Sequence, residues 1–137
     1  MTEDSKRKNI RDEVDKAERE LAQARLLKEA GHFDGCAGKA YYCAFHYARA
    51  LILTLGVEAK SHAGVNHLVN QHFVHTGRLS PETAKNLRWL QAGREESDYE
   101  VYAIFTDPVA EKSLAWAEEY RRAIRDLLTR DGYLSAP

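Results

Sequence analysis

The sequence has little cysteine and no excess of charge of either sign. Two cysteines in 137 residues are too few for a disulfide scaffold or a zinc ribbon. Twenty Lys and Arg balance twenty-one Asp and Glu, for a net charge of -1. A generic basic nucleic-acid binder would carry a positive excess, so any contact with nucleic acid has to be made locally by a few placed residues.

Long apolar runs are also missing. The longest, near Leu51–Leu55, is far too short to cross a bilayer. The start of the chain, Met1–Arg11, is polar and charged with no apolar stretch after it, unlike a secretory signal. We therefore expect no membrane partner and a cytoplasmic location.

Apolar residues recur at helical spacing through most of the chain, and no segment shows the strict alternation of a half-buried strand. This periodicity predicts one short helix and four long ones, at about residues 5–30, 34–56, 61–77, 80–99 and 107–132. Short turns between long helices favour antiparallel neighbours. The sequence thus predicts an all-α fold, an antiparallel up-and-down four-helix bundle with an additional short helix, as one domain over residues 1–137.

Turn-forming residues set the predicted helix ends. Asp34 is a predicted N-cap, and Ser80-Pro81 and Asp107-Pro108 each combine a capping residue with a proline at the first helical position. Glycines follow the predicted helices at positions 31, 56, 77 and 132, where a left-handed residue commonly ends a helix. Small residues recur along one side of the second helix, which predicts that it is the most buried.

Common catalytic and cofactor motifs do not occur. Gly38-Lys39 resembles the end of a phosphate-binding P-loop, but Phe33 stands at the position of its first glycine. Glycine-rich dinucleotide motifs and H-E-x-x-H are absent. The histidine pair His72 and His75 has no acidic partner at helical spacing, so we expect neither a bound metal nor a cofactor.

The second helix carries a stripe of polar and aromatic residues. Tyr42, His46 and Arg49 are spaced to share one face, and Lys39 joins them one turn earlier. Such a stripe is costly inside a bundle unless it is hydrogen-bonded or faces a groove. Two interpretations stay open: a satisfied polar network between helices, or one wall of an anion-binding or nucleotide-binding groove.

A second polar cluster ends the fourth helix, where Arg94 and Asp98 precede Tyr99, and Tyr102 follows. The guanidinium of Arg94 is suited to a phosphate. A helix end with exposed charges would look the same, so this cluster alone does not establish a site.

The two clusters together resemble a HEPN domain, and in particular the small stand-alone bacterial and archaeal HEPN proteins. The resemblance covers about residues 17–128 and is carried by four segments in order: AYYCAFHYARAL (40–51), GVEAKSHAGV (56–65), FVHTGRL (73–79) and REESDY (94–99). It implies a four-helix bundle that forms homodimers with a cleft between protomers. It also implies metal-independent ribonuclease or RNA-binding activity, often as a toxin paired with a minimal nucleotidyltransferase that adds AMP to a tyrosine.

The family's ribonuclease motif is an arginine followed, after four to six residues, by a histidine. Arg94 matches the arginine, but Tyr99 stands at the position of the histidine. A phenol with a pKa of about 10 is mostly protonated at pH 7 and makes a poor general base. His46 or His62 would then have to supply the proton chemistry from across a groove.

Three hypotheses follow: a nucleotide-binding or RNA-binding partner of a nucleotidyltransferase, an active metal-independent ribonuclease toxin, and a purely structural interaction protein. The predicted site places Arg94, Tyr99 and His46 around a shared cavity that holds phosphate. The predicted nucleotide-binding or RNA-binding residues around it are Lys39, Tyr42, Arg49, His62, Asp98 and Tyr102.

Overall fold

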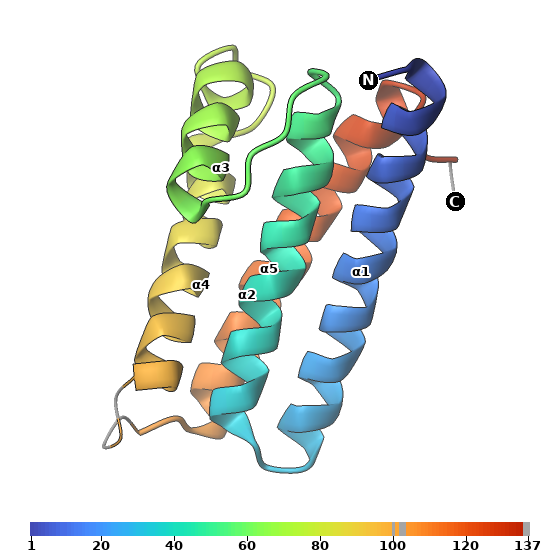
Figure 1. The fold of residues 1–137 in the computed structure, drawn as a ribbon. Helices are drawn as coiled ribbons and strands as arrows, with labels where there is room; N and C mark the ends of the chain where they lie inside the picture. The colour runs from blue at the N-terminus through green and yellow to red at the C-terminus, as the bar shows by residue number, and fades with distance from the viewer. Residues whose placement is uncertain (100, 102–103, 136–137) are drawn as a thin grey trace.

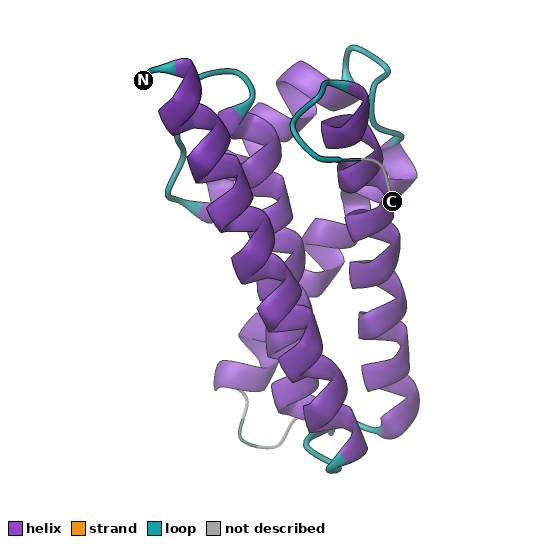
Figure 2. Ribbon diagram, turned by 90° about the vertical axis from the view of Figure 1, so that its right-hand side faces the viewer, coloured by secondary structure: helices purple, strands orange, loops and turns teal. Residues whose placement is uncertain are grey.

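The computed structural model describes residues 1–99, 101 and 104–135, in which all regular structure is helical (Figure 2). Its elements are α1 (Glu3–Glu29), α2 (Phe33–Leu53), α3 (His62–Val69), the π-helix η1 (Asn70–Val74), α4 (Pro81–Tyr99) and α5 (Asp107–Arg130). The four long helices alternate in direction, and the short α3 stands beside the start of α4 (Figure 1). The predicted all-α helical bundle is confirmed.

Serine side chains begin α3 and α4. Ser61 Oγ accepts a hydrogen bond from the Gly64 amide at 2.9 Å, and Ser80 Oγ accepts one from the Thr83 amide at 3.1 Å. Each bond satisfies a donor that the first turn of a helix leaves unpaired. The N-cap predicted at Ser80 is therefore confirmed, and α3 begins at the predicted position.

The two predicted aspartate caps are wrong. The N-cap position of α2 is occupied by His32, and Asp34 lies in the first turn, where its carboxylate accepts from the Gly35 amide at 2.9 Å. At α5 the cap is Thr106, whose hydroxyl accepts from the Val109 amide at 3.4 Å. Both aspartates instead place negative charge near a helix N-terminus, where the helix dipole favours it.

The third helix also differs from the prediction, because its α-helical part stops at Val69 and a π-helix follows. The amide of His75 donates to the carbonyl of Asn70 at 2.9 Å, a bond across five residues. Turns of this wider type are uncommon and frequently occur at functional sites.

Helix α2 lies at the centre of the bundle and packs against α1, α4 and α5 (Figure 1). Its alanines at positions 40, 44 and 48 are fully buried and allow neighbouring helices to approach closely. Tyr41 and Tyr47 are buried beside them. The prediction that this helix is the most buried is confirmed. The packing leaves only a narrow face of α2 at the surface.

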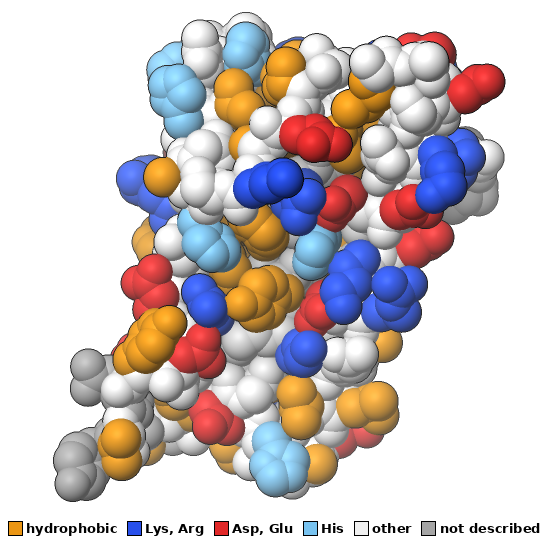
Figure 3. Space-filling view, in the orientation of Figure 1, with side chains coloured by type: hydrophobic (Ala, Val, Ile, Leu, Met, Phe, Trp, Pro, Cys, Tyr) orange, Lys and Arg blue, Asp and Glu red, His pale blue; other side chains and the backbone are white. Residues whose placement is uncertain are grey.

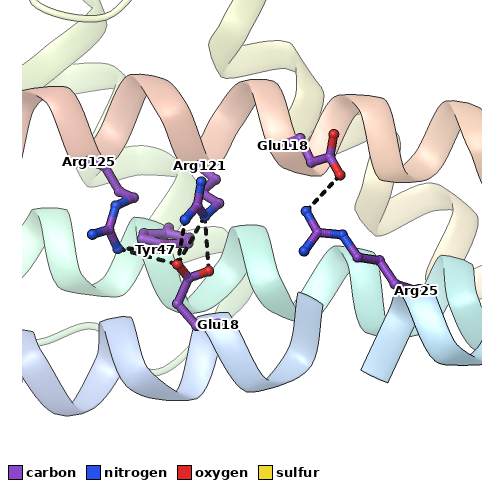
Figure 4. Close-up of polar contacts among 6 residues, drawn as sticks. All are labelled: Glu18, Arg25, Tyr47, Glu118, Arg121 and Arg125. Atoms are coloured by element: carbon purple, nitrogen blue, oxygen red, sulfur yellow. Dashed lines mark hydrogen bonds and ion pairs between the residues drawn. The ribbon is translucent and has the colours of Figure 1, made fainter. Parts of the chain in front are cut away.

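A polar cluster joins α1 to α5 and orients α1 against α2 (Figure 4). Arg121 donates to both carboxylate oxygens of Glu18, through Nε at 2.9 Å and Nη2 at 2.7 Å. Arg125 bonds both Glu18 and the hydroxyl of the buried Tyr47, at 3.4 and 3.2 Å. This bidentate arrangement fixes the rotation of α1 and so determines which α1 residues face α2.

Candidate functional site

The accessible face of α2 carries the stripe predicted from the sequence. Lys39, Tyr42, His46 and Arg49 are each half-buried, while the residues between them are buried. In the space-filling view, histidines and basic side chains surround a hydrophobic patch in the middle of this side of the molecule (Figure 3). The predicted sharing of one face is confirmed.

Four rings form a continuous contact series, here called the aromatic row: Tyr42, Tyr41, Phe45 and His62. Tyr42 meets Tyr41 edge-on at 5.3 Å between ring centroids, and Tyr41 stacks on Phe45 at 5.8 Å. Phe45 contacts His62 at 4.8 Å, and the Tyr41 hydroxyl bonds His62 Nδ1. Burial raises the pKa of Tyr41, so its phenol is neutral at physiological pH. Of the four rings, only those of Tyr42 and His62 are partly accessible.

Arg94 of α4 lies at one end of this row. Its guanidinium carbon is 5.4 Å from the centroid of the Tyr42 ring, and its Nε is 3.0 Å from a carboxylate oxygen of Asp98. Beside it is a cavity of about 250 Å³ lined by Lys39, Tyr42 and Asp98, with Gly35 and Gly38 on the α2 side. Three of the predicted binding residues thus line one cavity, next to the arginine of the predicted motif.

At the other end of the row, His46 and Arg49 share the carboxylate of Glu13 from α1. His46 Nδ1 is 2.7 Å from one oxygen and Arg49 Nη2 is 3.2 Å from the other. Arg49 also lies over the Phe45 ring at 5.9 Å. A second cavity, of about 280 Å³, is lined by Glu13 and Arg49. We call Glu13, His46 and Arg49 the Glu13 cluster.

Lys39, which lines the cavity beside Arg94, pairs with Glu20 of α1 at 3.1 Å. Glu20 is only 4% exposed, and its charge is also met by Lys16 at 3.1 Å. Burial raises the pKa of Glu20, but the hydrogen bonds from Lys16 and Lys39 outweigh it, so the pKa lies below its ordinary value. Lys39 is therefore held along the α2 face.

Not all predicted site residues are brought together. Tyr99 is 73% exposed at the end of α4, and Tyr102 lies outside the described residues. Arg94 and His46 lie near opposite ends of the aromatic row, at Tyr42 and Phe45. A single phosphate-holding cavity shared by Arg94, Tyr99 and His46 remains a prediction.

Sequence reasoning missed Glu13, Glu20 and the buried rings Tyr41 and Phe45. The two glutamates lie on α1, far along the sequence from the α2 side chains that they bind, and no local pattern marks such a pairing. The spacing of Tyr41 and Phe45, four residues apart on a helix, was the one available indication that these rings stack.

Both cysteines are buried and poorly suited to nucleophilic chemistry. Burial raises the pKa of Cys36 to about 11 and that of Cys43 to about 12, so both are thiols at neutral pH. Within the part of the chain that the structure describes, no group of three or more His, Cys, Asp and Glu is arranged to hold a metal. No described helix combines the length and the apolar character that a membrane span requires.

Comparison with known proteins gives concordant matches. The model of the HEPN domain matches residues 10–127. A UPF0332 protein of Archaeoglobus fulgidus is 30% identical over 86% of this chain and 94% of its own length. A UPF0332 protein of Gloeobacter violaceus is 38% identical, over 64% of this chain and 70% of that protein. A protein of Methanocaldococcus jannaschii, named as a candidate toxin, is 35% identical over 60% of this chain and 69% of its own.

Proposed function

This chain belongs to the HEPN domain family, and we propose that its α2 surface binds single-stranded RNA or a nucleotide. By the α2 surface, or candidate surface, we mean the aromatic row, Lys39, Arg94 and the Glu13 cluster. We further propose that it acts as the HEPN partner of a minimal nucleotidyltransferase in a toxin-antitoxin pair. Two relatives from Methanocaldococcus jannaschii are named as candidate toxins, which supports such a pairing.

The observation that carries the proposal is the aromatic row with one guanidinium group over Tyr42 and another over Phe45. Single-stranded RNA is commonly bound by stacking its bases on aromatic side chains while cations contact the backbone. Tyr42 and His62 are the two partly accessible rings on which bases would stack, and Arg94 and Arg49 lie over Tyr42 and Phe45. Because the whole chain is not basic, this local arrangement would account for binding by a nearly neutral protein.

Fluorescence anisotropy with a labelled single-stranded RNA in EDTA tests this proposal. Arg94→Ala should weaken binding about tenfold, since it removes both a phosphate donor and the contact that orients Tyr42. Arg122→Ala is the matched control, because Arg122 is an exposed arginine on α5 that lines a separate cavity. Equal losses in both variants, or no binding by the wild type, would refute the proposal.

Tyr99 is the residue that we propose the transferase modifies, because its hydroxyl stands on a ring that is 73% exposed beside the candidate surface. In that reaction the Tyr99 oxygen attacks the α-phosphorus of ATP, a phosphodiester bond to AMP forms and pyrophosphate leaves. Coexpression with the product of an adjacent nucleotidyltransferase gene should add the mass of AMP to the Tyr99 peptide. Tyr99→Phe should abolish the addition at that peptide.

The Glu13 cluster favours ribonuclease activity as a second candidate function. A carboxylate at 2.7 Å from Nδ1 orients the His46 ring, the arrangement by which a general base is commonly positioned. Cleavage of RNA in EDTA that is lost in His46→Ala would support this activity. If RNA is bound but stays intact, binding would be the only function supported.

We also propose a homodimer, because apolar side chains are exposed beside the candidate surface. Val101 and Ile104, in the connection that follows α4, are 89% and 83% exposed. Covering them with a second copy would remove apolar area from water. Light scattering coupled to size-exclusion chromatography should give twice the chain mass, and Ile104→Asp should lower it toward one chain.

A further inference from the structure

A cleft of about 130 Å³ separates α3 and η1 from the first half of α4. Val69 and Leu87 form apolar walls, and Tyr120 of α5 contributes to the cavity from the core. In the fold, α3 stands alongside the start of α4 at one end of the bundle (Figure 1). None of the residues discussed for the α2 surface lines this cleft.

The hydroxyl of Tyr120 is the first indication that the cleft binds a ligand. Tyr120 is 0% exposed, and its hydroxyl has no hydrogen-bond partner among the described residues. Burial raises its pKa, which keeps the group a neutral O–H donor. A buried polar group without a partner is uncommon because it has lost its hydrogen bonds to water without replacement.

The π-helix is the second indication. Asn70 begins η1, and its carbonyl accepts the five-residue bond that defines this turn. Asn70 lines the cleft, as does Asn66 one turn earlier. The amide of Asn66 is oriented by a bond of 3.3 Å to Gln91 Oε1. Two residues whose carboxamides each carry a donor and an acceptor therefore border one small cavity.

The third indication is charge at the rim. Lys85 and Arg88 of α4 line the cleft and are exposed. Neither forms an ion pair among the residues that the structure describes, whereas Arg94 on the same helix is paired with Asp98. The cleft thus combines apolar walls, a buried hydroxyl and two carboxamides with cations at its mouth.

We propose that this cleft binds the base of one pyrimidine nucleotide, with its phosphate on Lys85 and Arg88. The proposal rests on RNA or nucleotide binding as the proposed function and adds a base-selective pocket to it. A cavity of about 150 Å³ accommodates one benzene ring, so a cleft of this size suits a single six-membered ring better than a purine. The hydroxyl and carboxamides supply donors for the carbonyl oxygens of a pyrimidine.

The position of the cleft fits a path for one RNA strand. Asn66 lies one helical turn after His62, which belongs to the aromatic row, and Gln91 lies one turn before Arg94. A strand stacked on the aromatic row therefore needs to advance only along α3 to place its next base in the cleft. The RNA surface and the base pocket would then be contiguous.

Titration of the full chain with each of the four nucleoside 5′-monophosphates tests the pocket without any RNA. Isothermal calorimetry gives affinities, and the side-chain amide signals of Asn66 and Asn70 report the site by NMR. We expect UMP and CMP to bind and to shift both signals, and AMP and GMP to bind about tenfold more weakly. Equal purine binding, the same shifts with inorganic phosphate alone, or no binding at millimolar concentration would overturn the proposal.

Tyr120→Phe separates ligand binding from folding. Removing an unpaired buried hydroxyl should leave the melting temperature unchanged or raise it, while lowering the affinity for UMP about fivefold. Arg88→Ala should lower the affinity for all four monophosphates by the same factor, and Arg122→Ala should change none of these affinities. A Tyr120→Phe variant that loses stability and keeps its UMP affinity would show that the hydroxyl serves the fold.

The two proposals fail separately. If RNA binding depends on Arg94 but UMP does not bind, the cleft proposal is wrong and the α2 surface stands. If UMP binds the cleft but RNA binding is absent, the cleft is a nucleotide site and the RNA function is wrong.

Discussion

Replacing Glu13 by glutamine should tighten RNA binding, although it removes a residue of the candidate surface. The carboxylate of Glu13 neutralises Arg49 at 3.2 Å and contacts His46 at 2.7 Å. Glutamine keeps nearly the same shape, and its carbonyl oxygen still accepts hydrogen bonds. The substitution therefore removes one negative charge from the place where a phosphate would contact Arg49.

The size of the effect follows from the geometry. A phosphate oxygen hydrogen-bonded to the far side of Arg49 would lie about 6 Å from the Glu13 carboxylate. At that distance two like charges repel by about 0.7 kcal/mol at the dielectric constant of water and by about 3 kcal/mol at an effective value of ~20. Because the Arg49 side chain is 30% exposed, we take the lower end, which predicts about threefold tighter binding.

Anisotropy titrations over a salt series measure both the affinity and its salt dependence. An additional available cation should steepen the slope of log affinity against log salt by up to about 0.7. Glu118→Gln is the matched control, since Glu118 pairs with Arg25 at 2.9 Å on the α1–α5 side. If Glu13→Gln binds no more tightly than Glu118→Gln and keeps the wild-type slope, no phosphate contacts Arg49 and this half of the candidate surface is wrong.

Two further predictions concern stability. Glu18→Gln should lower the free energy of unfolding by about 1 kcal/mol at neutral pH, because it breaks a bidentate pair that is still partly exposed. Burial raises the pKa of Glu18, but the hydrogen bonds and charge of Arg121 outweigh this effect, so the pKa in the folded state lies below 4.5. The stabilisation is therefore present above pH 4.5 and is lost as the pH falls through the folded-state pKa. Urea unfolding should show the two proteins converging in acid, and a constant difference would contradict the assignment. Gly31→Ala should lower the free energy of unfolding by about 1 kcal/mol, because φ is +83° at Gly31, a conformation that alanine adopts only with strain. An added Cβ would meet nothing within 4 Å, so the backbone conformation alone accounts for this cost. Calorimetry measures the change, and an unchanged melting temperature would mean that the turn relaxes.

The elements that the sequence predicted well are those that depend on local order. The period of the apolar residues and the glycines that follow α1, α2, η1 and α5 located the helices to within a few residues, because both act within one or two turns. The same reasoning placed Tyr42, His46 and Arg49 on one face of α2. A helix has a fixed geometry, so spacing alone determines which of its side chains share a side.

The features that the sequence did not predict depend on how two elements meet. Glu13 reaches His46 only because α1 is rotated so that Glu13 faces α2, and Arg121 on α5 holds that rotation through Glu18. The π-helix after Val69 needs a shift in hydrogen-bond register that leaves no compositional mark. The wrong caps have a simpler cause: Asp34 and Asp107 favour the start of a helix from the first turn as well as from the cap.

The departure from the family's ribonuclease motif has a specific consequence in this fold. Tyr99 is largely solvated at the end of α4, so no enclosed site holds its phenol against a substrate. The two imidazoles of the candidate surface instead both contact the Phe45 ring, at 5.8 Å between ring centroids for His46 and 4.8 Å for His62. Nδ1 of each is already engaged, by Glu13 and by Tyr41, which leaves Nε2 of both rings for a substrate. Any RNA cleavage by this chain would therefore depend on the histidines that contact Phe45, whereas Tyr99 is proposed only as a residue that a transferase modifies.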